Sequence, residues 1–98
     1  MNLDLTNKTA MVCGSTQGIG KAIAIELAKL GANIILVARN EESLKRVKEE
    51  LDKTKGQKHH FISADFSNPA SVKEKAIDHI KINGPVHILV NNTGGPPG

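Results

Sequence analysis

Apolar residues along this chain of 98 residues follow two spacings that alternate from end to end. Short continuous apolar runs have the length of a buried strand, and the stretches between them repeat apolar residues every three or four positions, as one face of a helix does. Continuous apolar runs are typical of strands in a parallel sheet that helices cover on both faces. The runs predict four strands, at Thr9–Cys13, Asn33–Ala38, His60–Ala64 and Val86–Asn91.

A first helix is predicted between the first two strands, because apolar residues recur there at helical spacing. Gly31 lies just before the second strand, where a glycine commonly ends a helix. We expect one face of this helix to be marked by four larger apolar residues with small alanines beside them: Ile19, Ile23, Leu27 and Leu30.

The second and third helices have clear boundary signals. Apolar residues at helical spacing predict a second helix over Glu41–Thr54. Ser67-Asn68-Pro69 supplies a capping side chain followed by a proline in the first turn, and Asn83-Gly84-Pro85 closes the third helix. The buried face of the third helix is predicted to consist of Val72, Ala76 and Ile80.

Strands and helices in this alternation predict an α/β fold. Right-handed crossovers between consecutive strands give a parallel sheet in the order 3-2-1-4, the first half of a doubly wound, Rossmann-like sheet plus its fourth strand. Residues 1–98 are expected to form one part of a single domain, without a second core. Ligands of such folds bind where the carboxyl ends of the first and fourth strands meet.

A glycine-rich turn lies between the first strand and the first helix, with the sequence Gly14-Ser15-Thr16-Gln17-Gly18-Ile19-Gly20. Glycine lets the backbone turn tightly and lets a diphosphate approach it closely, while the free N–H groups of the following helix face the anion. The strand before the turn and the helix after it favour nucleotide binding over a turn with only a structural role.

Three motifs resemble those of the short-chain dehydrogenase/reductase family, and the resemblance covers the whole chain. The glycines are spaced as in the family's T-G-x-x-x-G-x-G motif, with Cys13 in the threonine position. Asn91-Asn92-Thr93-Gly94 is similar to the family's N-N-A-G element, with Thr93 in the alanine position. Asp65, just after the third strand, matches the aspartate that contacts adenine in the family.

The end of the second strand selects the cofactor in this family. Ala38 and Arg39 stand where an NAD-binding protein usually has an acidic residue, and a guanidinium can bind the 2′-phosphate of NADP bidentately. Ser15 is expected to add a hydroxyl to the same phosphate, whereas Gln17 stands where many NADP enzymes have a second basic residue. The alternative is that Arg39 is a solvated residue that opens a turn.

The resemblance implies a set of cofactor-binding residues. Asp65 would accept a hydrogen bond from adenine beside the Phe66 backbone, although an aspartate here also suits a plain turn. Asn91 would brace the loops at the strand ends and line the cofactor ribose. The complete set is Gly14, Ser15, Thr16, Gln17, Gly18, Ile19, Gly20, Arg39, Asp65, Phe66, Asn91 and Gly94.

The reaction implied by the resemblance depends on residues that this sequence lacks. The family uses a serine and a Tyr-x-x-x-Lys pair from later in the fold, and this chain contains no tyrosine. We therefore predict no catalytic residue here and interpret the chain as the cofactor-binding, N-terminal portion of an NADP(H)-dependent oxidoreductase. In the complete enzyme, expected to be a homo-oligomer, the substrate would be a carbonyl or alcohol, with a 3-oxoacyl thioester as the first guess.

Two alternatives to this interpretation stay open. The chain could act as a stand-alone nucleotide-binding module, or it could be a truncated product without function. The short tail from Gly94 to Gly98 is expected to be disordered.

Composition argues against several other functions. The net charge of +3 comes from 13 basic and 10 acidic residues without a basic block, and two phenylalanines are the only aromatic residues of the Phe, Trp and Tyr class, so no nucleic-acid partner is expected. No apolar stretch has membrane-spanning length, so no membrane partner is expected. A single cysteine, Cys13, suits a buried thiol in a reducing, cytoplasmic compartment.

The histidines do not predict a metal site. His59 and His60 are adjacent, so on a strand they point to opposite faces and cannot hold one ion together. His79 and His87 lie on other predicted elements, away from any partner at metal-ligand spacing.

Overall fold

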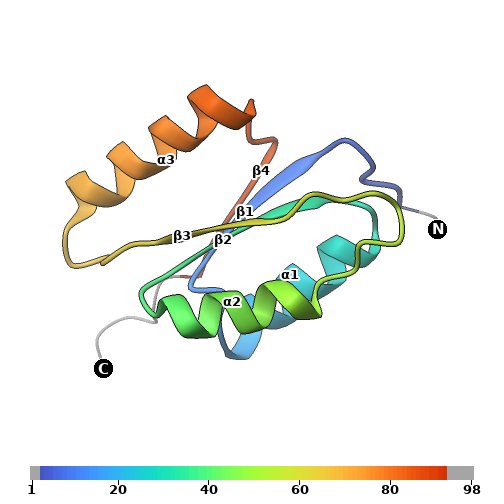
Figure 1. Ribbon diagram of the computed structural model, residues 1–98, viewed down its shortest axis with the longest axis horizontal. Helices are drawn as coiled ribbons and strands as arrows, with labels where there is room; N and C mark the ends of the chain where they lie inside the picture. Colours follow the sequence, from blue (N-terminus) through green and yellow to red (C-terminus); the bar gives the residue numbers. More distant parts are fainter. Residues whose placement is uncertain (1–2, 93–98) are drawn as a thin grey trace.

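Figure 1 shows a twisted parallel sheet with helices on both faces in the computed structural model, which describes residues 3–92. The sheet has four strands in the order β3-β2-β1-β4, so the predicted α/β fold and strand order are confirmed. In chain order the elements are β1 (Thr9–Cys13), α1 (Gly18–Lys29), β2 (Asn33–Ala38), α2 (Glu41–Glu50), β3 (His60–Ser63), α3 (Pro69–Asn83) and β4 (Ile88–Asn91).

Two apolar clusters lie on opposite faces of the sheet, because successive side chains of a strand point to opposite sides. Helices α1 and α2 cover one face, and α3 lies over the other (Figure 1). The α1/α2 side includes Val12, Ile34 and Leu44. The α3 side is smaller and includes Met11 and Ile35. Both central strands therefore contribute to two cores.

The face of α1 that packs on the sheet differs from the prediction. The fully buried residues of this helix are Gly20, Ala24 and Ala28, whereas Ile19 is 70% exposed. Small residues at this spacing let the helix backbone approach the sheet closely, and the larger apolar side chains lie beside the contact. The predicted marker residues therefore do not form its centre.

Three elements are shorter than predicted. Helix α2 ends at Glu50 rather than Thr54, because the backbone of Leu51 is extended (ψ 137°). The Asp52 carboxylate then accepts a hydrogen bond from the Thr54 N–H at 2.7 Å, which stabilises a turn in place of helix. Strand β3 ends at Ser63 and β4 begins at Ile88, one and two residues inside their predicted limits.

The predicted start of α3 is confirmed, and its predicted buried face is confirmed in part, since Val72 and Ala76 pack against the apolar cluster on this face of the sheet whereas Ile80 does not. Asn68 caps the helix by accepting a hydrogen bond from the Ser71 N–H at 3.3 Å, and Pro69 follows in the first turn. None of the described residues of α3 is fully buried, and Ile80 is 38% exposed. In Figure 1, α3 lies over one face of the sheet, and no other described helix lies on that face.

His59 holds the loop between α2 and β3 in place. Its ring is buried. Nδ1 accepts a hydrogen bond from the Ile34 N–H at 3.0 Å, and Nε2 lies 2.8 Å from the Asp52 carbonyl oxygen. These partners require a neutral ring with its hydrogen on Nε2, because only Nε2 faces an acceptor. Burial lowers the pKa of His59, which favours that neutral form. The sequence assigned this residue no role.

Candidate functional site

The predicted site residues leave the sheet at one edge. In the parallel register Cys13 pairs with Val37 on one side and with Asn91 on the other, and Ala38 pairs with Ser63. The glycine turn, Arg39, Asp65 and the Asn91 loop therefore all begin at the carboxyl ends of neighbouring strands. In this type of fold that edge forms the ligand-binding crevice.

Two glycines shape the turn in different ways. Gly18 has a φ of +61°, a conformation that favours glycine, and a Cβ built there meets no atom within 4 Å. A Cβ at Gly20 would overlap the carbonyl oxygen of Gly14 and would lie 3.0 Å from the Asn92 amide nitrogen. Gly18 therefore borders open space, whereas Gly20 is the point where the turn, α1 and the loop after β4 touch.

The amino end of α1 has no capping side chain. Its N-cap residue, Gln17, is extended (φ −157°, ψ 166°) and makes no side-chain cap, and the first turn contains no acidic residue. The N–H groups of a first helical turn have no partner within the helix and carry partial positive charge. Together with the open space at Gly18, this end of α1 can accept an anion.

Ser15 is buried, which does not suit its predicted contact with the 2′-phosphate. Its side chain is fully buried and its Oγ has no hydrogen-bond partner among the described residues, so it cannot reach a phosphate in solvent. Thr16, the next residue, is half-buried and lines an outer pocket together with Ser43 and Arg46 of α2. The hydroxyl nearest to solvent in the turn is therefore that of Thr16.

Arg39 and Asp65 lie near each other at the edge of β2 and β3. Arg39 is exposed, and its carbonyl oxygen accepts a hydrogen bond from the Ser63 hydroxyl at 2.9 Å. Asp65 Oδ1 accepts from the Ser67 N–H at 2.9 Å and from the Ser67 hydroxyl at 2.7 Å. These bonds, with a smaller contribution from the Arg39 charge, lower the pKa of Asp65 and keep it ionised. The turn role of Asp65 is thus observed, and it uses one carboxylate oxygen.

The remaining site residues lie around the ends of β1 and β4. Phe66 is half-buried and packs against the α3-side core. Cys13 is a free, buried cysteine, and burial raises the pKa of its thiol. Asn91 ends β4 opposite Cys13, whereas Gly94 lies outside the described residues, as does the tail that was expected to be disordered.

Asn92 has a role that sequence reasoning missed. Its N–H donates to the Cys13 carbonyl oxygen at 3.1 Å, and its amide nitrogen lies against Gly20. The residue therefore ties the loop after β4 to the glycine turn. Its place beside Asn91 in the motif was visible, but a contact across 72 positions of the chain was not.

Residues 3–92 contain no group of three or more histidine, cysteine or acidic side chains that could hold a metal ion. Within the same residues, no helix has both the length and the apolar character needed to cross a membrane. The groups described at the carboxyl edge of the sheet are backbone N–H groups, hydroxyls, the Arg39 guanidinium and the Asp65 carboxylate. This arrangement suits the binding of a phosphorylated ligand.

The sequence profile described as short chain dehydrogenase matches residues 8–98. The chain belongs to the short chain dehydrogenase family. The match begins just before β1 and therefore includes every described strand and helix.

Similar proteins place the chain within the family. The inactive hydroxysteroid dehydrogenase-like protein 1 of Homo sapiens is 45% identical over 85 residues, which cover 87% of this chain and 26% of that protein. The NADP(+)-dependent L-rhamnose 1-dehydrogenase of Thermoplasma acidophilum is 41% identical over 93 residues, which cover 94% of this chain and 36% of that protein.

A solved member of the short chain dehydrogenase family has the same fold. The crystal structure of L-sorbose reductase from Gluconobacter frateurii, complexed with NADPH and L-sorbose, superposes with a TM-score of 0.85 at 35% identity. The match covers 97% of this chain and 36% of the reductase. The chain therefore spans about a third of the length of these relatives.

Proposed function

We propose that this chain binds NADP(H) at the carboxyl edge of its sheet, as the nucleotide-binding part of a short-chain oxidoreductase. The observation that carries the proposal is the uncapped amino end of α1, which opens at Gly18 into free space. Without a capping side chain, the partial positive charge of this helix end is available to a diphosphate. Two relatives, the L-rhamnose dehydrogenase and the L-sorbose reductase, are named with NADP(H), which supports the same ligand class.

The adenosine 2′-phosphate would lie between the glycine turn and the end of β2. Arg39 is exposed there and supplies a guanidinium, and Thr16 takes the hydroxyl role that was predicted for Ser15. A charged, bidentate donor favours the phosphate of NADP, whereas the hydroxyl of NAD gives it little to bind. Gln17 leaves this phosphate without a second basic contact from the turn.

The adenine and its ribose would lie over the ends of β3 and β4. Asp65 uses Oδ1 to hold its own turn, so Oδ2 is the oxygen we assign to the adenine amino group, beside the Phe66 backbone. The backbone of Asn91 would line the ribose, and Gly94 would extend the same wall. Each of these contacts remains part of the proposal.

When bound, NADPH supplies the hydride for reducing a carbonyl carbon. The residues of this chain would bind and orient the nucleotide and keep its phosphates charged and paired. We assign them no catalytic role, and residues 1–98 are then the N-terminal dinucleotide-binding part of one Rossmann-like domain. The carbonyl or alcohol substrate, with a 3-oxoacyl thioester as the first guess, stays a prediction, as does a homo-oligomeric complete enzyme.

A nucleotide-binding role without turnover is the second candidate. One of the most similar relatives is itself named inactive, at 45% identity, so similarity over these residues does not decide activity. This candidate predicts NADPH binding and no reaction even in the longest natural form of the protein. The main proposal predicts reaction with a carbonyl substrate in that form.

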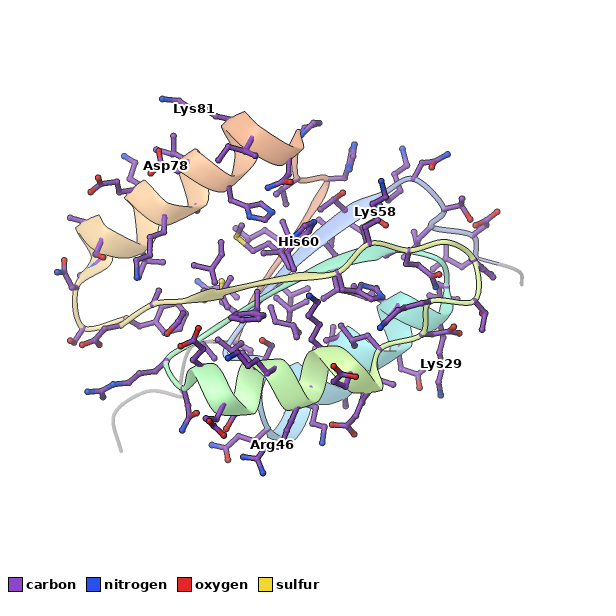
Figure 2. The ribbon with its side chains drawn as sticks, in the orientation of Figure 1. Lys29, Arg46, Lys58, His60, Asp78 and Lys81 are labelled. Atoms are coloured by element: carbon purple, nitrogen blue, oxygen red, sulfur yellow. The ribbon has the colours of Figure 1, made fainter. Side chains whose placement is uncertain are left out.

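Titration of the chain with NADPH and NADH tests the cofactor assignment. Arg39→Ala should weaken NADPH binding by about tenfold to a hundredfold, or about 1.5–3 kcal/mol for one charge-assisted contact, and should leave NADH within about twofold. Lys29→Ala is the charge-matched control, because Lys29 lies at the other end of α1 (Figure 2). Equal losses for both cofactors, or an equal loss in the control, would remove the 2′-phosphate assignment.

A further inference from the structure

A second cavity lies at the opposite edge of the sheet, at the amino ends of the strands and below the last turn of α3. Its volume is about 280 Å³, near the lower end of the range for small-ligand sites. Six polar residues line it: Thr9, Asn33, Lys58, His60, His79 and Asn83. Because three of them begin β1, β2 and β3, the cavity is separate from the nucleotide edge. We call it the His60–His79 cavity.

Two imidazoles from different elements meet in this cavity. His60 begins β3, and His79 lies near the carboxyl end of α3. Their ring centroids are 5.1 Å apart in an edge-to-face arrangement. Figure 2 shows His60 and Lys58 on the side of the sheet that faces α3. The sequence predicted no partnership between these histidines, because they are 19 positions apart and belong to different elements.

The hydrogen-bond partners of His79 fix which of its nitrogens carries the hydrogen. The Asn83 amide nitrogen donates to the His79 carbonyl oxygen at 3.3 Å, which sets the orientation of the amide. The same nitrogen is 3.4 Å from His79 Nδ1, so Nδ1 is the acceptor. A neutral ring must then carry its hydrogen on Nε2. That Nε2 is buried and has no hydrogen-bond partner among the described residues.

A buried hydrogen-bond donor without a partner requires an acceptor. The charge of the other residues that line the cavity also favours an acceptor, as follows from Lys58. Lys58 brings a positive charge, and none of the described residues that line the cavity is acidic. Asp78 and Lys81, the charged residues on either side of His79 in the sequence, point away from the sheet (Figure 2). Burial and the neighbouring His60 lower the pKa of His79, which keeps Nε2–H as a neutral donor.

These observations favour an anion over a cation as the ligand of the cavity. A metal ion needs the lone pair of Nε2, which the hydrogen occupies in this tautomer, and it would be repelled by the Lys58 ammonium. An anion with several acceptor oxygens can instead take the Nε2–H donor and the ammonium at once. Phosphate groups have this property, and lysine commonly binds them as a point charge.

We propose that the His60–His79 cavity binds a small phosphate-bearing anion, with His79 Nε2–H and the Lys58 ammonium as its principal donors and His60 as a flanking ring. The shared chemistry is a phosphate group, which could come from inorganic phosphate or from a phosphate monoester of a small metabolite. The site is independent of the proposed nucleotide function, because it lies at the other edge of the sheet.

Nuclear magnetic resonance of the histidine rings tests the site directly. The chain is titrated with inorganic phosphate at constant ionic strength, balanced with chloride, and the ring C–H signals of His60 and His79 are followed. We expect both signals to shift together and to saturate with a dissociation constant of about 1–10 mM. NADPH is added in a second series, so that phosphate binding at the glycine turn is separated from binding at the cavity.

Matched variants decide which residues hold the anion. Lys58→Gln should weaken phosphate binding about fivefold or more, whereas Lys81→Gln, which removes the same charge from the outer side of α3, should change it less than about twofold. His79→Phe keeps an aromatic ring of similar size and removes the donor, so it should abolish saturation at His60. If His79→Phe unfolds at the temperature of the experiment, phosphate binding by the two lysine variants still tests the proposal.

Several results would overturn the proposal. A shift that rises linearly with phosphate and never saturates would mean general ionic effects, and equal losses in Lys58→Gln and Lys81→Gln would mean the same. Shifts produced by zinc chloride but not by phosphate would make the cavity a cation site. Glycerol 3-phosphate that saturates at lower concentration than inorganic phosphate would support the proposal and identify a monoester as the source.

Discussion

The substitution Gly20→Ala tests the contact that joins the glycine turn to the loop after β4. An alanine Cβ would overlap the carbonyl oxygen of Gly14 and would lie 3.0 Å from the Asn92 amide nitrogen. The first of these atoms belongs to the backbone, so it cannot move aside as the end of a flexible side chain can. The turn, α1 or both must shift to accommodate one methyl group.

The expected cost follows from two opposing effects. Alanine is about 1 kcal/mol more favourable than glycine inside a helix. Adding a methyl group to a packed site costs about 1–3 kcal/mol, and a backbone overlap belongs at the upper end of that range. The free energy of unfolding should therefore fall by about 2 kcal/mol, and NADPH binding should weaken because the turn that faces the phosphates has moved.

Gly18→Ala and Gly56→Ala provide matched comparisons. Both glycines have positive φ, +61° and +82°, and a Cβ at either position meets no atom within 4 Å. Each substitution should cost about 1–2 kcal/mol of stability from the left-handed backbone alone. Only Gly18→Ala should also weaken NADPH binding, because only Gly18 borders the proposed phosphate site. A bulkier Gly18→Val should abolish binding while helical content is retained.

Urea unfolding followed by far-ultraviolet circular dichroism measures the stabilities, and NADPH titration measures the binding. The order of stability should be wild type, then Gly18→Ala and Gly56→Ala together, then Gly20→Ala. A Gly20→Ala protein as stable as the wild type would refute the close contact of turn and helix. A Gly18→Ala protein that binds NADPH as well as Gly56→Ala does would refute the placement of the phosphates.

Three further predictions concern pH, turnover and association. The free energy of unfolding should fall as the pH drops below about 6.5, because burial lowers the pKa of His59 from 6.5 in the folded state. Protonation of Nδ1 then removes the acceptor for the Ile34 N–H. In urea titrations, His59→Gln should reduce this dependence of stability on pH. Incubated with NADPH and a panel of ketones and acyl thioesters, the chain should oxidise no NADPH above the uncatalysed rate, and turnover by the pure polypeptide would reveal a catalytic group that this reasoning missed. The chain should associate with rising concentration in sedimentation experiments, because β4 pairs only with β1 among residues 3–92 and Leu89 is 66% exposed. Leu89→Lys should weaken this association, and NADPH should raise the Tm. A monomer at every concentration would contradict the edge-pairing argument.

The arrangement of strands was predictable from the apolar runs, the helix-length connections between them and the right-handed crossover rule. The continuous run in β2 requires a strand covered on both faces, and helix-length connections require parallel neighbours. The start of α3 was predictable for a similar reason, since the Asn68 cap acts within three residues. These features are local or follow from handedness, so the linear sequence contains them.

The features that sequence reasoning missed depend on distance in three dimensions. Helix α1 packs through Ala24 and Ala28 because the sheet accepts a close approach there, and a periodicity count favours the larger Ile19 instead. The burial of Ser15 follows from which way one turn residue points. The His60–His79 pair arises only when α3 crosses the start of β3. No spacing in the sequence signals any of these.

The central position of β1 has a consequence for the order in which the protein folds. Met11 pairs with Ile35 on one side and with Leu89 on the other, so the two contacts close loops of 24 and 78 positions. The longer closure costs about 1 kcal/mol more chain entropy, and distant pairings form slowly. During synthesis β4 is also made after β1, β2 and β3. We therefore expect strands β1 to β3 to assemble first and the nucleotide edge, which needs Asn92 against Gly20, to be completed only after β4 has joined them.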